Sequence, residues 1–290
     1  MLLRDPFSLA AAARDYYFSQ VTAAADSIAG SFPERRVVLC GGASGSGKTT
    51  TAHNIAKSLE RHGLHGEIIS LDNFYFGIDK APRLPDGSYD YESVDALDLA
   101  GLDNCIGTLL RDGTAMLPVF DFIADMPSEE GRQMDIDPND VIILEGIHAQ
   151  NPRLKNAVAG VNTLNLFISV ERGFFDNGRQ ILSPKDIRLI RRLVRDLKFR
   201  GSSFSNTHEM WRQVSVSEDV GIFPFKGEAD IIIDTFHCFE PCLMKNFVMK
   251  GAAKEPENPS TRRLLDALGR FACVGSDVLS QDCLLHEFVG

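Results

Sequence analysis

The chain has 290 residues, of which 44% are hydrophobic, and a formal net charge of −10. This length suits one large α/β domain or two small ones, and the acidic balance argues against nucleic acid as a partner, because binding it needs a basic surface. No run of about 18 apolar residues is present, so we expect no segment that spans a membrane.

The N-terminal residues and the cysteines support three further expectations. An alanine-rich stretch at 7–30, with apolar residues at helical spacing, predicts a packing helix within an N-terminal segment, 1–35. The first residues lack the charged and long apolar regions of a secretory signal, so we expect a cytoplasmic protein. Six cysteines, none of them in a CxxC pair, predict reduced thiols and no zinc site.

Residues 42–49 match G-x-x-x-x-G-K-[ST], the pattern of a phosphate-binding P-loop. An apolar run at 36–40 precedes the motif and a helical pattern at 48–62 follows it, which is the strand–loop–helix context that it requires. In such a loop backbone N–H groups surround phosphate oxygens, Lys48 reaches the β- and γ-phosphates, and the Thr49 hydroxyl holds Mg²⁺. The residues predicted to bind nucleotide here are Gly42, Ala43, Ser44, Gly45, Ser46, Gly47, Lys48, Thr49 and Thr50.

Strand-like runs alternate with helical patterns along the chain. The runs lie at 36–40, 67–71, 141–144, 164–168 and 230–233, and the helical patterns at 48–62, 95–111, 151–158 and 184–199. This alternation predicts a parallel sheet with helices on both faces, which binds its ligands at the carboxyl ends of the strands. Two segments rich in Gly, Pro and Asp, 77–92 and 124–140, are predicted to be loops over that edge.

Two carboxylates follow strand-like runs. Asp72 comes after the run at 67–71, which we predict to lie beside the P-loop strand, and it is placed to take a proton from an attacking hydroxyl. An Asx turn or a helix cap is the structural alternative. Glu145 follows the run at 141–144 and is the candidate for holding Mg²⁺, with a purely structural acid as the alternative. For His148, a loop or cap role is as consistent with the sequence as substrate contact.

Residues 185–200 form a positive segment in a negative chain, with seven Lys or Arg and two Asp. Four arginines recur at i, i+3, i+4 and i+7, which places them on one face of a helix: Arg188, Arg191, Arg192 and Arg195. Such a row suits gripping phosphates, and Gly201 can begin a hinge, so we predict an Arg-rich helical lid over about 184–218. A solvated amphipathic helix is the alternative.

Four blocks in order carry a resemblance: GASGSGKTT at 42–50, SLDNFY at 70–75, VFDF at 119–122 and ILEGIH at 143–148. Together with RLIRRLVRDLKFRG at 188–201, they resemble the uridine kinase and phosphoribulokinase family of P-loop kinases. The tail LLHEFVG at 284–290 looks like that of bacterial uridine-kinase-related nucleoside kinases.

The resemblance covers about 36–290 and implies a P-loop kinase domain at 36–250 followed by a C-terminal helical extension, 251–290, packed on it. Members of the family transfer the γ-phosphate of ATP-Mg²⁺ to a hydroxyl of a small molecule, which in uridine kinases is the ribose 5′-hydroxyl. By this resemblance the catalytic residues are Lys48, Asp72, Arg192 and Arg195, with Arg188 and Arg191 on the nucleotide, Thr49 and Glu145 on the metal, and Asp72, Tyr75, Tyr89, Phe122 and His148 on the acceptor.

One departure bears on the substrate. Uridine kinases follow the Asp-Phe pair with a His and an Arg that help to recognise the pyrimidine, whereas Asp121-Phe122 is followed here by Ile-Ala-Asp-Met-Pro, 123–127. A nucleoside, uridine or cytidine first, remains the expected acceptor, and a kinase for another sugar or sugar phosphate is the alternative. A nucleotide-binding regulator without turnover is a third reading. Family members often self-associate, which makes a homo-oligomer compatible with the resemblance.

Overall fold

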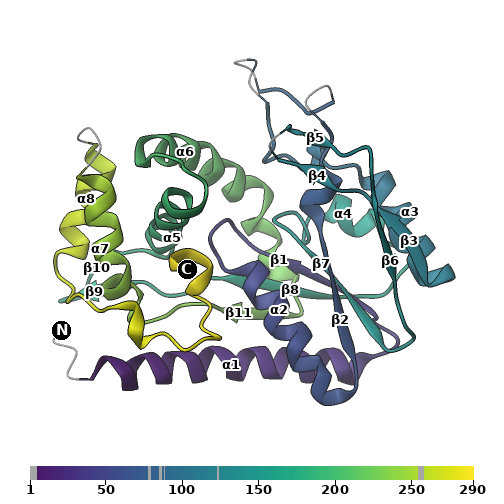
Figure 1. Ribbon diagram of the computed structural model, residues 1–290, viewed down its shortest axis with the longest axis horizontal. Coiled ribbons are helices and arrows are strands. Elements are labelled where there is room, and N and C mark those ends of the chain that lie inside the picture. Colours follow the sequence, from purple (N-terminus) through teal and green to yellow (C-terminus); the bar gives the residue numbers. More distant parts are fainter. Residues whose placement is uncertain (1–4, 78–79, 85–86, 88, 123, 254–257) are drawn as a thin grey trace.

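The computed structural model describes residues 5–77, 80–84, 87, 89–122, 124–253 and 258–290. Five parallel strands form its central sheet in the order β11-β8-β1-β7-β2 (Figure 1). Their bounds are β1 Val37–Gly41, β2 His65–Ser70, β7 Asp140–Glu145, β8 Thr163–Ser169 and β11 Ile231–Asp234. Each overlaps a strand-like run of the sequence, and the predicted fold class, a parallel α/β sheet of the P-loop type, is confirmed.

The neighbours of the P-loop strand differ from the expectation. We predicted that the strand before Asp72 lies beside β1, and this is wrong, because β7 lies between β1 and β2. All six residues of β7 are buried, whereas only one residue of β2 is buried. The apolar strand therefore takes the inner position and the more polar one takes the edge. Glu145, the last residue of β7, consequently lies between Cys40 of β1 and Ser70 of β2.

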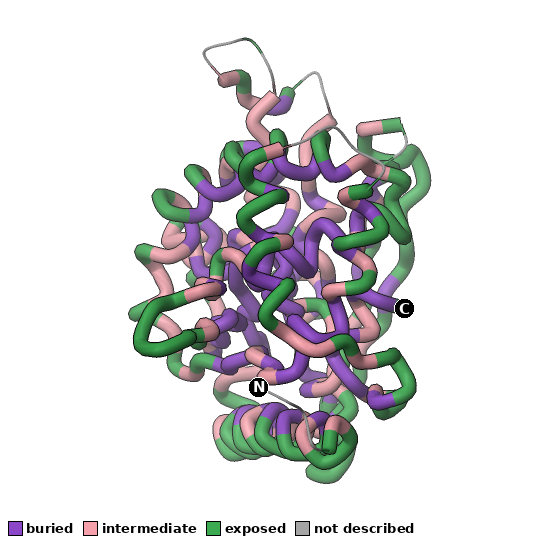
Figure 2. Tube along the Cα trace, turned by 90° about the vertical axis from the view of Figure 1, so that its left-hand side faces the viewer, coloured by how far each residue is buried: buried purple, intermediate pink, exposed green. Residues whose placement is uncertain are grey.

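Alternating residues of the inner strands divide the core in two, because successive side chains point to opposite faces. Val38, Cys40 and Ile143 belong to the larger cluster with α1 Pro6–Ser31, α2 Lys48–Leu59 and the C-terminal helices. Leu39 and Leu144 belong to the smaller cluster with α3 Leu99–Asp112 and α4 Pro152–Ala157. Figure 2 shows that buried residues are concentrated in the interior and that exposed residues lie mostly around them.

Further short strands and helices surround this sheet. The segment at 124–140, predicted as a loop, contains β5 and β6 as well as the start of β7, so that prediction is wrong in part. The strands are β3 Thr114–Leu117, β4 Phe120–Asp121, β5 Met126–Pro127, β6 Arg132–Asp135, β9 Phe174–Asp176 and β10 Arg179–Leu182. The α-helices are α5 Pro184–Phe199, α6 Phe204–Gly221, α7 Glu240–Ala252, α8 Pro259–Leu268 and α9 His286–Val289. The 3₁₀ helices are η1 Glu60–His62, η2 Leu71–Phe74, η3 Val94–Ala96, η4 Phe223–Glu228 and η5 Ser276–Val278.

Local sequence features fix the two ends of helix α5, and three other helices pack against it. Ser183 and Asp186 form a capping box at its start, Pro184 occupies the first turn, and Gly201 follows its end with φ +64°. It packs against α6, α7 and α9, and nine of its sixteen residues are buried, including three arginines. The helix is thus part of the core, which differs from the solvated amphipathic alternative.

Helix α1 lies along the molecule below α2 (Figure 1). The Asp5 carboxylate caps its N-terminus, and the hydroxyl of Tyr17, fully buried, lies 3.0 Å from the Thr51 hydroxyl of α2. The contact ties α1 to the helix that carries the P-loop motif. Within the described part of the chain, none of the helices has the length and apolar character needed to cross a membrane.

Candidate active site

The P-loop connects the end of β1 to the start of α2, at Lys48. Gly45 and Gly47 adopt left-handed conformations with φ +71° and +85°. A Cβ atom on Gly45 would lie 2.9 Å from the Arg188 carbonyl oxygen, and one on Gly47 would lie 2.8 Å from Leu284 Cδ1. Both positions need glycine for conformation and for space, so the loop and its neighbours are built around these two residues.

A cleft of about 220 Å³ opens over this loop. It brings together residues from six separate parts of the chain, which include the P-loop, the end of β2 and the end of β7. Its lining residues are Ser44, Gly45, Gly47, Lys48, Thr49, Asp72, Tyr75, Glu92, Glu145, Gly146, Ile147, Arg192, Arg195, Arg200 and Glu287. A larger groove of about 700 Å³ lies between α7 and α8, but its lining includes none of these residues, and we therefore assign the chemistry to the smaller cleft.

Thr49 and Glu145 form an oxygen-rich pair at the bottom of the cleft. The Thr49 hydroxyl donates to Glu145 Oε2 at 3.2 Å, and the Lys48 ammonium lies 3.3 Å from the Ala43 carbonyl oxygen. Burial raises the pKa of Glu145 to about 7, although nearby Lys48 opposes this shift. A hydroxyl and a carboxylate side by side are suitable ligands for Mg²⁺, so these residues fit a metal-bound nucleotide phosphate.

Asp72 lies in η2, just past the carboxyl end of β2. Ser70 caps this turn by accepting a hydrogen bond from the Asp72 N–H at 3.2 Å, so the cap does not use the Asp72 carboxylate. That carboxylate has no hydrogen-bond partner among the residues that the structure describes and faces the cleft. Burial raises its pKa, and Lys48 and Arg200 oppose the rise. The group is therefore free to accept a proton from a molecule in the cleft.

The four arginines predicted as one row divide into two pairs. Arg192 and Arg195 line the cleft, whereas Arg188 and Arg191 do not. The Arg188 guanidinium forms an ion pair with Glu218 of α6 at 2.8 Å, and the Arg191 guanidinium with Glu240 of α7 at 2.7 Å. Helical spacing places all four arginines on one face of α5. Two of their guanidiniums turn away from the cleft because buried carboxylates of α6 and α7 bind them. Arg188 and Arg191, predicted to contact nucleotide, are thus held behind the P-loop.

These buried arginines hold the P-loop from its carbonyl side. Arg188 donates to the Ser44 carbonyl at 2.9 Å, Arg191 donates to the Gly45 carbonyl at 3.2 Å, and the Thr235 hydroxyl donates to the Ser46 carbonyl at 2.6 Å. With its carbonyl oxygens bonded behind, the loop can present N–H groups to the cleft.

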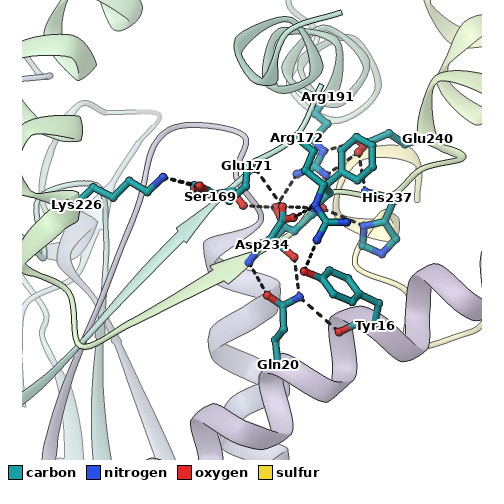
Figure 3. A network of polar contacts seen from close by, with 12 residues as sticks. Tyr16, Gln20, Ser169, Glu171, Arg172, Arg191, Lys226, Asp234, His237 and Glu240 are labelled. Carbon is teal, nitrogen blue, oxygen red and sulfur yellow. Dashed lines mark hydrogen bonds and ion pairs between the residues drawn. The ribbon is translucent and has the colours of Figure 1, made fainter. Parts of the chain in front are cut away.

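The network around Arg191 extends to α1 (Figure 3). The backbone N–H of His237 donates to Glu240 Oε1, and Asp234 at the end of β11 pairs with Arg172. Gln20 of α1 accepts from the Asp234 N–H at 2.9 Å. Gln20, Arg191, Asp234 and Glu240 lie on α1, α5, β11 and α7, so the network fixes the support of the P-loop to the edge of the sheet and to the N-terminal helix.

One buried carboxylate orients the cationic side of the cleft. Asp196, 3% exposed, lies 3.2 Å from Arg192, 3.2 Å from Arg195 and 3.6 Å from Arg200. All three guanidiniums line the cleft. A single anion thus fixes the directions of three cations, which would otherwise repel one another.

Replacing this carboxylate tests its role. Asp196→Asn keeps the side-chain shape and removes the charge, so the arginines should lose their common anchor and kcat/KM for ATP should fall about tenfold. Steady-state kinetics with ATP as the varied substrate measure this effect. Asp219→Asn is the control, because Asp219 pairs with Lys185 at the surface. An unchanged kcat/KM in Asp196→Asn would contradict the positioning role.

The cleft includes three charged residues that sequence reasoning did not single out: Glu92, Arg200 and Glu287. Burial raises the pKa of Glu92 to about 7. Arg200 belongs to the positive segment and Glu92 to a loop predicted over the binding edge of the sheet. Their positions in the sequence therefore indicated in part that both lie near the site. Nothing in the sequence pattern connects Glu287 with the P-loop, because 237 residues separate Glu287 from its partner Thr50.

Of the residues predicted to contact the acceptor, Asp72 and Tyr75 line the cleft, whereas Tyr89, Phe122 and His148 do not. The Arg83 guanidinium lies over the Tyr89 ring, 4.2 Å from the centre of that ring. The Phe122 side chain is 66% exposed. His148 is buried, and burial lowers its pKa to about 4, which keeps the ring neutral. Ile123, on which part of the sequence departure rests, lies outside the described residues.

A P-loop on a five-stranded parallel sheet, with an oxygen pair for a metal, a carboxylate that faces the cleft and clustered arginines, defines a P-loop phosphotransferase. The model of the Phosphoribulokinase / Uridine kinase family matches residues 37–240, and the chain belongs to this family. Its members are phosphotransferases that act on hydroxyl groups.

Named relatives agree with this family. A uridine kinase from Lactobacillus helveticus is 33% identical over 202 residues, which cover 69% of this chain and 87% of the relative. A uridine kinase from Halobacterium salinarum is 29% identical and covers 69% of this chain and 80% of the relative. The solved structure of a possible uridine kinase from Bacillus stearothermophilus has a TM-score of 0.50 at 18% identity, over 74% of this chain and 98% of that one, and supports the fold.

Proposed function

We propose that this protein transfers the γ-phosphate of ATP, bound with Mg²⁺, to a hydroxyl group of a nucleoside, with the 5′-hydroxyl of uridine or cytidine first among acceptors. The observation that carries the proposal is that Lys48, the Thr49–Glu145 pair and the Asp72 carboxylate meet in one cleft. Among the described residues, the Asp72 carboxylate has no hydrogen-bond partner. The uridine kinases at up to 33% identity support the choice of acceptor. A sugar or sugar phosphate is the second candidate, because the sequence after Asp121-Phe122 departs from uridine kinases.

The proposed mechanism assigns each group one task. The P-loop N–H groups and Lys48 bind the phosphates, and Thr49 and Glu145 would hold Mg²⁺, which neutralises phosphate charge when bound. Asp72 accepts the proton of the attacking hydroxyl as the new P–O bond forms and the bond to the β-phosphate oxygen breaks. Arg192 and Arg195 stabilise the negative charge of the phosphoryl group as it is transferred. Arg200 lines the same cleft and adds a third positive charge.

An acceptor panel tests this function directly. With Mg²⁺-ATP, we expect uridine or cytidine to stimulate ADP release in a coupled assay, above purine nucleosides, ribulose 5-phosphate, pantothenate and glycerate. The Lys48→Ala variant supplies the baseline. Stimulation by a sugar phosphate in place of a nucleoside would move the assignment to the second candidate, and no stimulation by any acceptor would contradict kinase turnover.

The metal pair predicts a pH dependence. Because the pKa of Glu145 is about 7, its carboxylate form is lost as the pH falls through 7, and with it a ligand for Mg²⁺. Between pH 8 and pH 6 the ionised fraction falls about tenfold, and Mg²⁺-dependent affinity for a non-hydrolysable ATP analogue should fall by a similar factor. Titration calorimetry at several pH values measures it. A Glu145→Gln variant that kept the same pH profile would contradict this origin.

A further inference from the structure

The segment 283–290 packs its side chains onto the start of α2 and onto α5. The Glu287 carboxylate accepts a hydrogen bond from the Thr50 hydroxyl at 2.6 Å and a longer one from the Thr50 N–H at 3.4 Å. Leu284 fills the space beside Gly47, and the Phe288 ring lies 5.2 Å from the Arg191 guanidinium. In Figure 1 this yellow segment lies beside α5, which it contacts.

Thr50 is the third residue of α2, and its N–H is one of the first helical N–H groups that has no partner within the helix. In a P-loop these N–H groups hold the phosphate oxygens of the nucleotide. A carboxylate is also an oxygen anion, and it makes the same kind of hydrogen bond. Glu287 therefore takes a donor that a phosphate would use, and the two anions repel if both are present.

The surroundings show which part of the segment can move. Leu284, Leu285 and Phe288 are completely buried, and Lys198 donates to the carbonyl of Val289. These contacts hold the backbone in place, because moving it would expose three large apolar side chains to water. Glu287 itself is only half-buried and lines the cleft, so its side chain can rotate while the segment stays packed.

We propose that Glu287 occupies part of the phosphate site in the nucleotide-free protein and leaves it by side-chain rotation when a nucleotide binds. The inference rests on the proposed function, since it assumes that the cleft binds a nucleoside triphosphate. Its consequence is a threshold for anions. A ligand with few contacts, such as inorganic phosphate, does not displace the carboxylate, whereas a triphosphate that also reaches Lys48 and the arginines does.

Binding of a non-hydrolysable ATP analogue with Mg²⁺ tests the proposal without turnover. We expect Glu287→Gln to bind the analogue about tenfold more tightly than the wild type in calorimetry, because the competing anion is gone. Inorganic pyrophosphate should gain affinity in the same direction. The Thr50 amide resonance should differ between the two free proteins and coincide once the analogue is bound.

Asp277→Asn is the matched control, because it also removes one negative charge from the C-terminal region. Asp277 is exposed in η5 and does not line the cleft. Glu287→Asp, which shortens the reach but keeps the charge, should show a smaller gain and covers the case in which Glu287→Gln folds poorly. Equal or weaker binding by Glu287→Gln would overturn the role of Glu287 and leave the kinase proposal standing. Absence of analogue binding in every variant would overturn both.

Discussion

Asp72→Asn is expected to lower kcat by about 10³-fold while the affinity for ATP changes little. The asparagine has nearly the same shape, but it cannot accept the proton of the attacking hydroxyl. The Asp72 carboxylate faces the cleft without a hydrogen-bond partner among the described residues, and Ser70 caps the turn in its place. Removing the carboxylate should therefore affect the transfer step and spare the local fold.

Steady-state kinetics with the preferred acceptor, together with calorimetry of a non-hydrolysable ATP analogue, measure the two parts of this prediction. Asp103→Asn is the matched control, since Asp103 lies on the exposed side of α3. Turnover within a few-fold of the wild type in Asp72→Asn would assign proton removal to another group or to solvent.

Lys48→Ala is expected to reduce kcat/KM for ATP by about 10³-fold, because the ammonium group both binds the phosphates and stabilises charge as the γ-phosphoryl group is transferred. A second effect follows from its position. Lys48 opposes the rise in the pKa of both Asp72 and Glu145, so its loss should raise both values further. The pH at which both carboxylates lose their protons should therefore rise, and the remaining activity should shift to higher pH.

Rates measured across pH 6 to 9 separate these two effects. Lys57→Ala, an exposed change on the same helix, controls for helix stability. If Lys48→Ala retained the pH profile of the wild type, the electrostatic link between Lys48 and the two carboxylates would be refuted. If kcat/KM for ATP hardly changed, the cleft would not be the phosphate site.

Local pattern was sufficient for the P-loop and for most of the sheet. The eight residues at 42–49 need particular backbone conformations, such as the positive φ of Gly42 and Gly47, and the motif specifies glycine at both positions. The buried strands read as apolar runs, because a strand covered on both faces has no polar side to present. Strand order was not encoded in this way, and the prediction that placed β2 beside β1 failed for that reason.

The arginines of α5 show what residue spacing alone cannot predict. Their spacing predicted a helix, and α5 is one. Spacing cannot distinguish Arg188 from Arg192, because their partners differ: Glu218 of α6 pairs with Arg188, whereas Asp196 of α5 itself pairs with Arg192, which lines the cleft. The partner lies 30 residues along the chain in one case and four in the other.

The P-loop, the positions of Lys48 and Thr49, the two carboxylates that follow strands and the α/β class could all be predicted from the amino-acid sequence, because each depends on a short stretch of residues. Three features depend on contacts between distant segments: β7 separates the strands of the P-loop and of Asp72, Arg192 and Arg195 line the cleft, and Glu287 contacts Thr50. The physical reason is that hydrogen bonds and ion pairs depend on distance in space. Residues far apart in sequence acquire that proximity only when the core has packed.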